Sequence, residues 1–98
     1  ELISVLKAHF TPQRNFAAKY SFVIEGQAQP LFVGIREDQI DCHYGEESGV
    51  DVIVKMKSTI LEEITSGRMT FQRAFTVGDM SAKGQFATLR MLDTIFNF

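Results

Sequence analysis

The chain has 98 residues, of which 45% are hydrophobic and 22% charged, and its formal net charge is −2. This balance is typical of one small globular domain covering residues 1–98 and argues against a disordered chain. Lys and Arg are scattered, which argues against a nucleic-acid partner because such a partner favours a basic face. No apolar run approaches the ~18 residues that cross a bilayer, so stable membrane insertion is not expected.

The chain begins with Glu1 and contains a single cysteine, Cys42. One cysteine allows no intrachain disulfide, and a cytoplasmic location is the default expectation. The lack of an initiator Met is consistent with a domain that follows an N-terminal partner domain in a longer product.

The first half of the chain predicts a helix followed by three strands. Residues 2–10 carry apolar side chains at helical spacing, and Pro12 interrupts that pattern soon afterwards. Residues 19–26, 31–37 and 40–45 alternate apolar and polar side chains, as half-buried strands do. The second and third of these strands are separated by a tight turn and are expected to form a hairpin.

The second half predicts two strands and three helical segments. Residues 50–57 alternate most regularly, and the period then changes to that of a helix at 58–66, where Thr59 and Glu62 have the spacing of a capping box. A short helical turn is predicted at 70–76, a fifth strand at 77–84, and a helix from residue 86 to the C-terminus. Strands joined by hairpins, with helices gathered in the second half, predict an α+β fold.

The last predicted helix carries more apolar residues than one contact face requires. A helix that lies on a sheet needs an apolar stripe about 100° wide. Ala87, Met91 and Ile95 widen the apolar arc beyond that stripe. The possible second contacts are the helix at 58–66, a second subunit, a membrane and a bound apolar ligand.

No set of residues has the spacing of a catalytic, metal or cofactor site. Cys42 and His43 are neighbours on a strand, so a buried cysteine and an exposed histidine are expected on opposite faces. The adjacent glutamates at 46–47 and 62–63 are typical of a solvated surface, and no phosphate-binding loop motif occurs. We therefore expect no catalytic residue, no metal, no cofactor and no enzyme activity.

Four short motifs in the second half have a recognisable order. They are DVIVKM at 51–56, TSGRM at 65–69, AF at 74–75 and GDMSAKG at 78–84, and an apolar helical segment follows them. This order resembles the type-2 sterol carrier protein family, whose members are SCP2-like sterol/lipid-transfer domains. The resemblance is close over residues 50–96, and over residues 1–49 it extends to the order of elements alone.

The resemblance implies a five-stranded, largely antiparallel sheet covered on one face by helices, with an apolar cavity between the two layers. Such a cavity would bind a lipid or other apolar small molecule, such as a fatty acid, an acyl-CoA or a sterol-like compound. Arg68 or Arg90 would meet an acidic headgroup at its mouth. The residues expected to line the cavity are Val52, Val54, Leu61, Ile64, Met69, Phe75, Phe86, Leu89 and Ile95. The alternative is a ligand-free module that forms a homodimer or joins an N-terminal enzyme or regulator domain.

Overall fold

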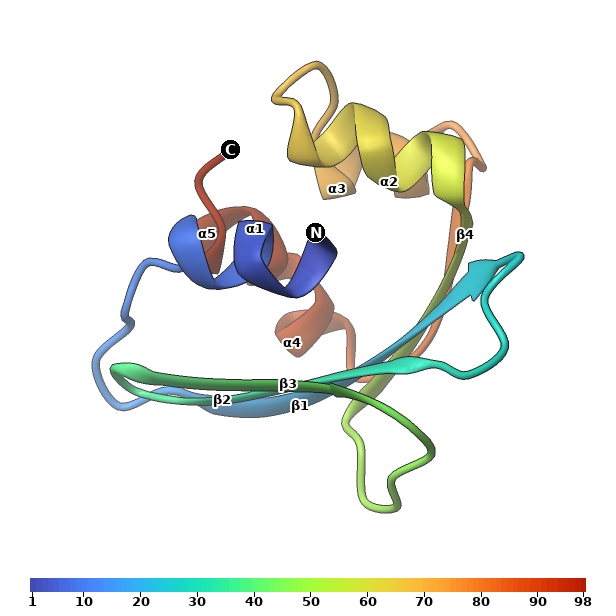
Figure 1. Cartoon of the computed structure of the whole chain (residues 1–98). Coiled ribbons are helices and arrows are strands. Elements are labelled where there is room, and N and C mark those ends of the chain that lie inside the picture. Colours follow the sequence, from blue (N-terminus) through green and yellow to red (C-terminus); the bar gives the residue numbers. More distant parts are fainter.

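The computed structural model describes all 98 residues, and its helices lie together on one side of a curved sheet (Figure 1). The helices are α1 (Leu2–Ala8), α2 (Ser58–Thr65), α3 (Phe71–Thr76), α4 (Phe86–Arg90) and α5 (Leu92–Ile95). The strands are β1 (Ala17–Glu25), β2 (Leu31–Arg36), β3 (Gln39–Tyr44), β4 (Val52–Lys57) and β5 (Met80–Gly84).

The sheet has the strand order β3-β2-β1-β4-β5. The pairs β1–β2, β2–β3 and β4–β5 are antiparallel, while the central pair β1–β4 is parallel. The predicted hairpin between the second and third strands is confirmed, and so is the largely antiparallel α+β fold with helices on one face. The parallel pair arises because the chain passes through the β2–β3 hairpin before it returns beside β1.

The core lies between the helices and the inner face of the sheet. In β1, Tyr20, Phe22 and Ile24 are buried, and in β4, Val52 and Val54 are buried, as the alternating pattern predicts. Each such apolar side chain contributes roughly 1.5–3 kcal/mol by leaving water. All buried residues except Phe32 form one cluster that includes side chains from α2, α3, α4 and α5, so the helices are held to the sheet by a common core.

Asp51 joins the three strands β1, β4 and β5 where the parallel pair begins. Its carboxylate accepts a hydrogen bond from the backbone N–H of Lys19 at 2.9 Å, and its own N–H donates to the carbonyl of Lys19 at 2.8 Å. Its carbonyl accepts from the N–H of Gln85 at 3.1 Å. The aspartate of the DVIVKM motif therefore stabilises the fold at this junction.

Two details of the predicted helices are wrong. Helix α2 begins at Ser58 and its N-cap is Lys57 without a side-chain cap, so Thr59 lies inside the first turn and the capping box with Glu62 does not form. The C-terminal segment is two short helices interrupted at Met91, and it leaves helical geometry after Ile95.

The C-terminal helix ends early because its last residues pair with the segment after α1. Phe96 forms an isolated β-bridge with Phe10, and the N–H of Thr11 donates to the carbonyl of Ile95 at 2.7 Å. The N–H of Asn97 donates to a carbonyl of that same segment at 3.0 Å. These long-range hydrogen bonds replace the intrahelical ones that a longer helix would make.

Candidate ligand-binding cleft

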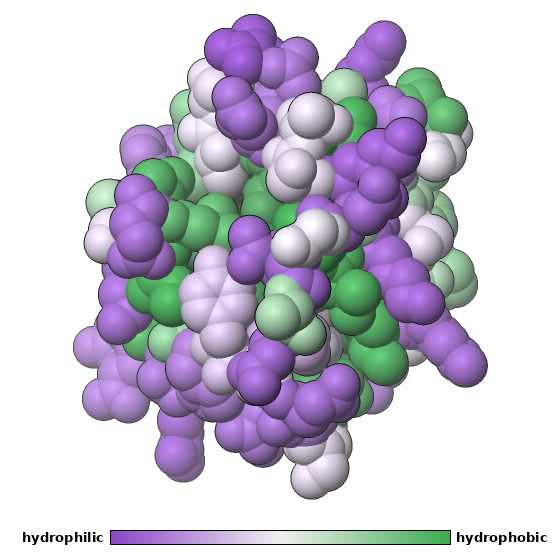
Figure 2. Space-filling model, turned by 45° about the vertical axis from the view of Figure 1, so that its right-hand side comes forward, coloured by the Kyte–Doolittle hydropathy of each residue, from purple (hydrophilic) through white to green (hydrophobic).

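A cleft of about 480 Å³ opens between α3, β5 and the two C-terminal helices. Its floor is apolar and its rim carries polar and charged side chains, which is the usual character of a small-molecule site. On the face in Figure 2, hydrophobic side chains reach the surface in patches between hydrophilic ones. The residues that line the cleft are Phe71, Gln72, Phe75, Thr76, Met80, Phe86, Leu89, Arg90 and Asp93.

Two side chains fix the start of α3, which forms one wall of the cleft. The hydroxyl of Thr70 accepts a hydrogen bond from the N–H of Arg73 at 3.1 Å. The carboxylate of Asp93 in α5 accepts from the N–H groups of Phe71 at 2.8 Å and Gln72 at 2.9 Å. The free N–H groups of this helix end are thus satisfied, and α3 is held against α5.

An exposed aromatic pair stands at the mouth of the cleft. The ring centroids of Phe75 in α3 and Phe86 in α4 are 5.9 Å apart, with the rings at 63°. Their exposed fractions are 36% and 60%, although most large apolar side chains of this chain are buried. The pair connects the two helices across the cleft and leaves apolar surface in water.

A second groove, of about 490 Å³, lies between α1, α2 and the end of β1, and it shares no residue with the cleft. Leu2 and Val5 of α1 face Leu61 of α2 across it, with Ile24 and Tyr44 from the sheet. A wider basin on the outer face of the sheet is rimmed by charged side chains and has less apolar character. The cleft and the groove are therefore two separate openings on the helical side.

The structure does not gather the nine expected lining residues around one cavity. Phe75, Phe86 and Leu89 line the cleft, and Leu61 lines the groove. Met69 is half-buried against the core. The remaining four, Val52, Val54, Ile64 and Ile95, are fully packed in the core between the two openings. Their contact with a ligand stays a prediction.

Several residues of the cleft were missed by sequence reasoning. Met80 lies on the predicted fifth strand and Phe71 in the predicted helical turn, and neither is among the expected lining residues. Their apolar character was a signal that could have included them. The sequence did not indicate a role for Asp93, because the backbone N–H groups of Phe71 and Gln72 that it caps lie 22 and 21 residues away in the chain.

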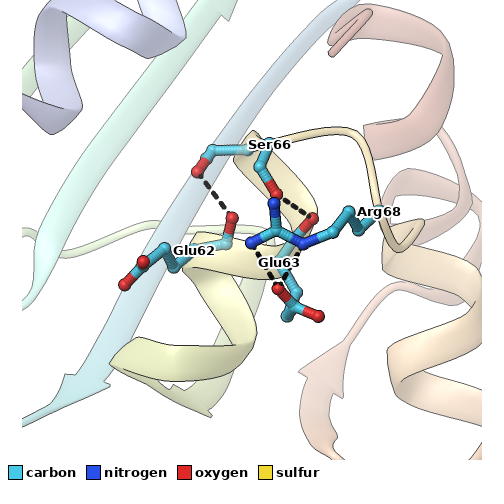
Figure 3. Close-up of polar contacts among 5 residues, drawn as sticks. Glu62, Glu63, Ser66 and Arg68 are labelled. Carbon is cyan, nitrogen blue, oxygen red and sulfur yellow. Dashed lines mark hydrogen bonds and ion pairs between the residues drawn. The ribbon is translucent and has the colours of Figure 1, made fainter.

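The two arginines proposed for the headgroup differ in their surroundings. Arg68 follows α2, and its Nε donates to Oε2 of Glu63 at 2.7 Å (Figure 3). This hydrogen bond raises the pKa of Arg68 and occupies its guanidinium. Arg90 lines the cleft and forms no ion pair. The geometry therefore favours Arg90.

The surroundings raise the pKa of two buried ionisable groups. Burial, followed by the charge of Asp51, raises the pKa of Tyr20, whose hydroxyl donates to the carbonyl of Thr88 in α4 at 2.6 Å. Burial also raises the pKa of the Cys42 thiol to about 11. His43 lies on the opposite face of β3, where its ring stacks on that of Phe32 with the ring centroids 4.9 Å apart. The predicted separation of Cys42 and His43 on opposite faces of the strand is therefore confirmed.

No group of three or more His, Cys, Asp or Glu side chains is arranged to hold a metal ion. A helix able to span a bilayer is not found either, and the longest helix has 8 residues.

The family model described as the SCP-2 sterol transfer family matches residues 11–97. The chain belongs to the SCP-2 sterol transfer family. This result confirms the resemblance seen in the motifs of the second half and extends it over the first half. No curated protein sequence matches the chain.

Solved structures show where else this SCP-2 fold occurs. A mutant of the sec-alkyl sulfatase PisA1 matches with a TM-score of 0.83 and 16% identity, over 99% of this chain and 16% of that chain. The UbiJ-SCP2 ubiquinone synthesis protein matches with a TM-score of 0.73 and 16% identity, over 96% of this chain and 88% of that chain. Palmitated SCP2L2 from Aedes aegypti matches with a TM-score of 0.67 and 15% identity, over 87% of this chain and 78% of that chain. At these identities the likeness shows a shared fold.

Proposed function

We propose that this SCP-2 domain binds a lipid or other apolar small molecule, such as a fatty acid, an acyl-CoA or a sterol-like compound, without catalysing a reaction. The observation that carries the proposal is the cleft between α3, β5 and α4, with an apolar floor and two aromatic side chains at its mouth. The palmitated relative from Aedes aegypti supports a fatty acid as one ligand of this fold. We place the proposed binding in the cytoplasm.

The binding energy would come from removing the ligand's hydrocarbon chain from water. Each buried CH₂ contributes ~0.8 kcal/mol, so a chain of ~12 methylenes offers roughly 10 kcal/mol before entropic costs are subtracted. An empty apolar cavity of ~300 Å³ would cost on the order of 7 kcal/mol. This cost gives a physical reason for the core between the cleft and the groove to be closed in a domain without ligand.

Binding in this view requires side chains of the closed core to move apart. The ligand would enter beside Phe75 and Phe86, displace their contact, and reach Leu89 on the floor. Ile64 and Ile95 would then contact the inner part of the chain, as the expected lining proposes. Arg90 at the rim would pair with an acidic headgroup, since a guanidinium binds carboxylate and phosphate groups well.

A second candidate function is a ligand-free interaction module. The sulfatase structure favours it, because there the fold makes up 16% of a longer chain. In that case the exposed aromatic pair would contact a second copy of this chain or a fused N-terminal domain.

Native mass spectrometry of the protein isolated from cells, combined with titration of a fluorescent fatty acid, separates the two functions. A monomer with an adduct of lipid mass supports binding, whereas a ligand-free dimer that takes up no fluorescent fatty acid would falsify it. Leu89→Trp fills the floor of the cleft and should abolish fatty-acid uptake. Ile53→Trp is the matched control, since Ile53 is half-exposed on the outer face of the sheet. Uptake by both variants would show that the site lies elsewhere.

A further inference from the structure

The strand β5 forms one edge of the sheet. It is the last strand in the order β3-β2-β1-β4-β5, so one side of its backbone faces away from the sheet. The N–H and C=O groups on the free side of an edge strand can pair with a further strand, and natural proteins usually cover such an edge or place charges on it. Ser81, Lys83 and Gly84 of β5 are exposed. This edge is therefore a place where a strand of another molecule can be added.

Exposed apolar side chains gather beside this same edge. Phe75, Val77 and Phe86 are three of the four large apolar residues that are exposed in this chain. Phe75 lies in α3 and Val77 directly after it, before β5 begins, while Phe86 is the first residue of α4, after β5 ends. Both helices contact β5. An edge strand flanked by exposed apolar side chains indicates a surface that another protein covers.

The charges along the edge fit a second copy of this chain. Asp79 directly precedes β5 and Lys83 lies near its end, and both are exposed and form no ion pair. The alternation of the strand places both on the outer face of the sheet, with Ser81 midway between them. Lys55 and Lys57 lie across a shallow opening from Asp79, and neither forms an ion pair with it. A strand with an acid at one end and a base at the other is complementary to itself when two copies run antiparallel.

We propose that the protein forms a symmetric dimer in which the β5 strands of two copies pair antiparallel about Ser81. In this register Asp79 of each copy lies opposite Lys83 of the other, and opposite charges at facing positions stabilise a strand pair. A lysine on an edge strand opposes pairing with most strands, but here the facing aspartate neutralises it. The interface does not depend on the proposed function.

The two-fold axis of this dimer also explains the position of the exposed apolar residues. An isologous interface brings the residues before one β5 beside the residues after the other. Val77 of one copy would therefore approach Phe86 of the second copy on the helical side of the joined sheet. Burial of these side chains removes apolar surface from water and adds to the strand pairing.

Disulfide trapping of the full chain tests the register. Ser81→Cys places a thiol at the two-fold axis, where directly opposed Cα atoms lie about 4.5–5.5 Å apart, within reach of a disulfide. Lys55→Cys is the matched control, because Lys55 is exposed and lies beside Ser81 in the β4–β5 register. Two copies of Lys55 would be ~14 Å apart across three strand spacings, too far for a disulfide.

Oxidised glutathione should link Ser81→Cys into a covalent dimer and leave Lys55→Cys monomeric on a denaturing gel. The native thiol of Cys42 is buried and should not react. Equal linking of the two variants, or none of Ser81→Cys, would overturn the proposal.

Sedimentation equilibrium tests the charge pairing. Lys83→Asp should raise the dissociation constant of the dimer about tenfold or more, because like charges then face each other twice in each dimer. Asp79→Lys should do the same, and the two changes combined should return the constant to near its original value. Lys55→Asp is the control, one strand inward, and should leave it unchanged. Phe86→Ser should raise it about tenfold through lost burial.

The proposal is overturned if the unchanged protein stays a monomer at every concentration at which it is soluble. It is also overturned if Lys83→Asp dimerises normally, or if the combined exchange is folded by circular dichroism and does not restore the dimer. A monomer whose β5 instead captures a strand of a different protein would likewise overturn it.

Fatty-acid uptake separates this proposal from the proposed function. Asp79 and Lys83 do not line the cleft, so Lys83→Asp should dissociate the dimer and keep uptake. A protein that takes up fatty acid as a monomer keeps the proposed function and loses the interface. A dimer with the expected charge dependence that takes up no fatty acid keeps the interface and loses the proposed function.

Discussion

The carboxylate of Asp93 in α5 accepts a hydrogen bond from the backbone N–H of Phe71, the first residue of α3, at 2.8 Å. Its second oxygen accepts from the N–H of Gln72 at 2.9 Å. Phe71 is buried, and its side chain forms part of the cleft floor. One aspartate therefore holds the start of α3 against α5 at one wall of the cleft.

Asp93→Ala should lower the free energy of unfolding by about 1–2 kcal/mol, because two N–H groups at the start of α3 lose their acceptor. Urea denaturation followed by circular dichroism measures this loss. The control is Asp79→Ala, which removes an exposed carboxylate without side-chain hydrogen bonds and should change stability by less than about 0.5 kcal/mol. Equal midpoints for the two variants would contradict the role given to Asp93.

Gly84→Ala should destabilise the fold by about 3 kcal/mol or more. Gly84 has a φ of +131°, and an added Cβ would overlap with the backbone carbonyl of Asp51 at the β4–β5 junction. Gly78→Ala provides the comparison, since Gly78 has a φ of +86° but no atom near the position of a Cβ. It should cost about 1 kcal/mol from backbone strain alone. Thermal melts that place Gly84→Ala at or above Gly78→Ala would refute the steric explanation.

Tyr20→Phe should lower the free energy of unfolding by about 1–2 kcal/mol, because the carbonyl of Thr88 loses a donor that lies 2.6 Å away in a part-buried site. Tyr44→Phe is the matched control, because the hydroxyl of this 40% exposed residue forms no hydrogen bond within the protein. Chemical denaturation of the two variants makes the comparison. A loss of equal size in both would indicate that the contact with α4 contributes nothing.

The buried thiol of Cys42 should make the protein less stable as the pH rises from about 9 to about 11. An unfolded thiol loses its proton near pH 9, whereas burial raises the pKa of Cys42 to about 11 in the folded state. Deprotonation in this window therefore favours the unfolded state, and the contribution of the thiol is fully present below pH 9. Denaturation midpoints measured across the window should fall less steeply for Cys42→Ala than for the unchanged protein.

The same burial should protect Cys42 from thiol reagents in the folded protein. The thiolate is the reactive form, and a pKa of about 11 leaves little of it near neutral pH. Reaction with a chromogenic disulfide should be slow in buffer and complete in denaturant. Rapid reaction in buffer would show that β3 opens locally.

The elements with local signals could be predicted from the sequence. Alternating side chains located the β2–β3 hairpin and the inward faces of β1 and β4, because a strand places successive side chains on opposite faces. The motifs of the second half, with Asp51 at their start, were sufficient to indicate the family. Of the cleft, Phe75, Phe86 and Leu89 were predicted, since each is apolar and lies on an element that faces the sheet.

Features that depend on partners distant in the chain could not be predicted in this way and required the three-dimensional arrangement. The apolar pattern after residue 86 predicts one helix, but the bridge between Phe96 and Phe10 ends it early. Asp93 looks like a solvated helical residue until α3 is placed beside it. The distance between the helices and the sheet also decides whether Val54 and Ile95 contact a ligand or only other side chains of the core. The spacing of apolar residues along the chain indicates which side of a helix or strand is buried. The distance between the helices and the sheet depends instead on the packing of all side chains in the core.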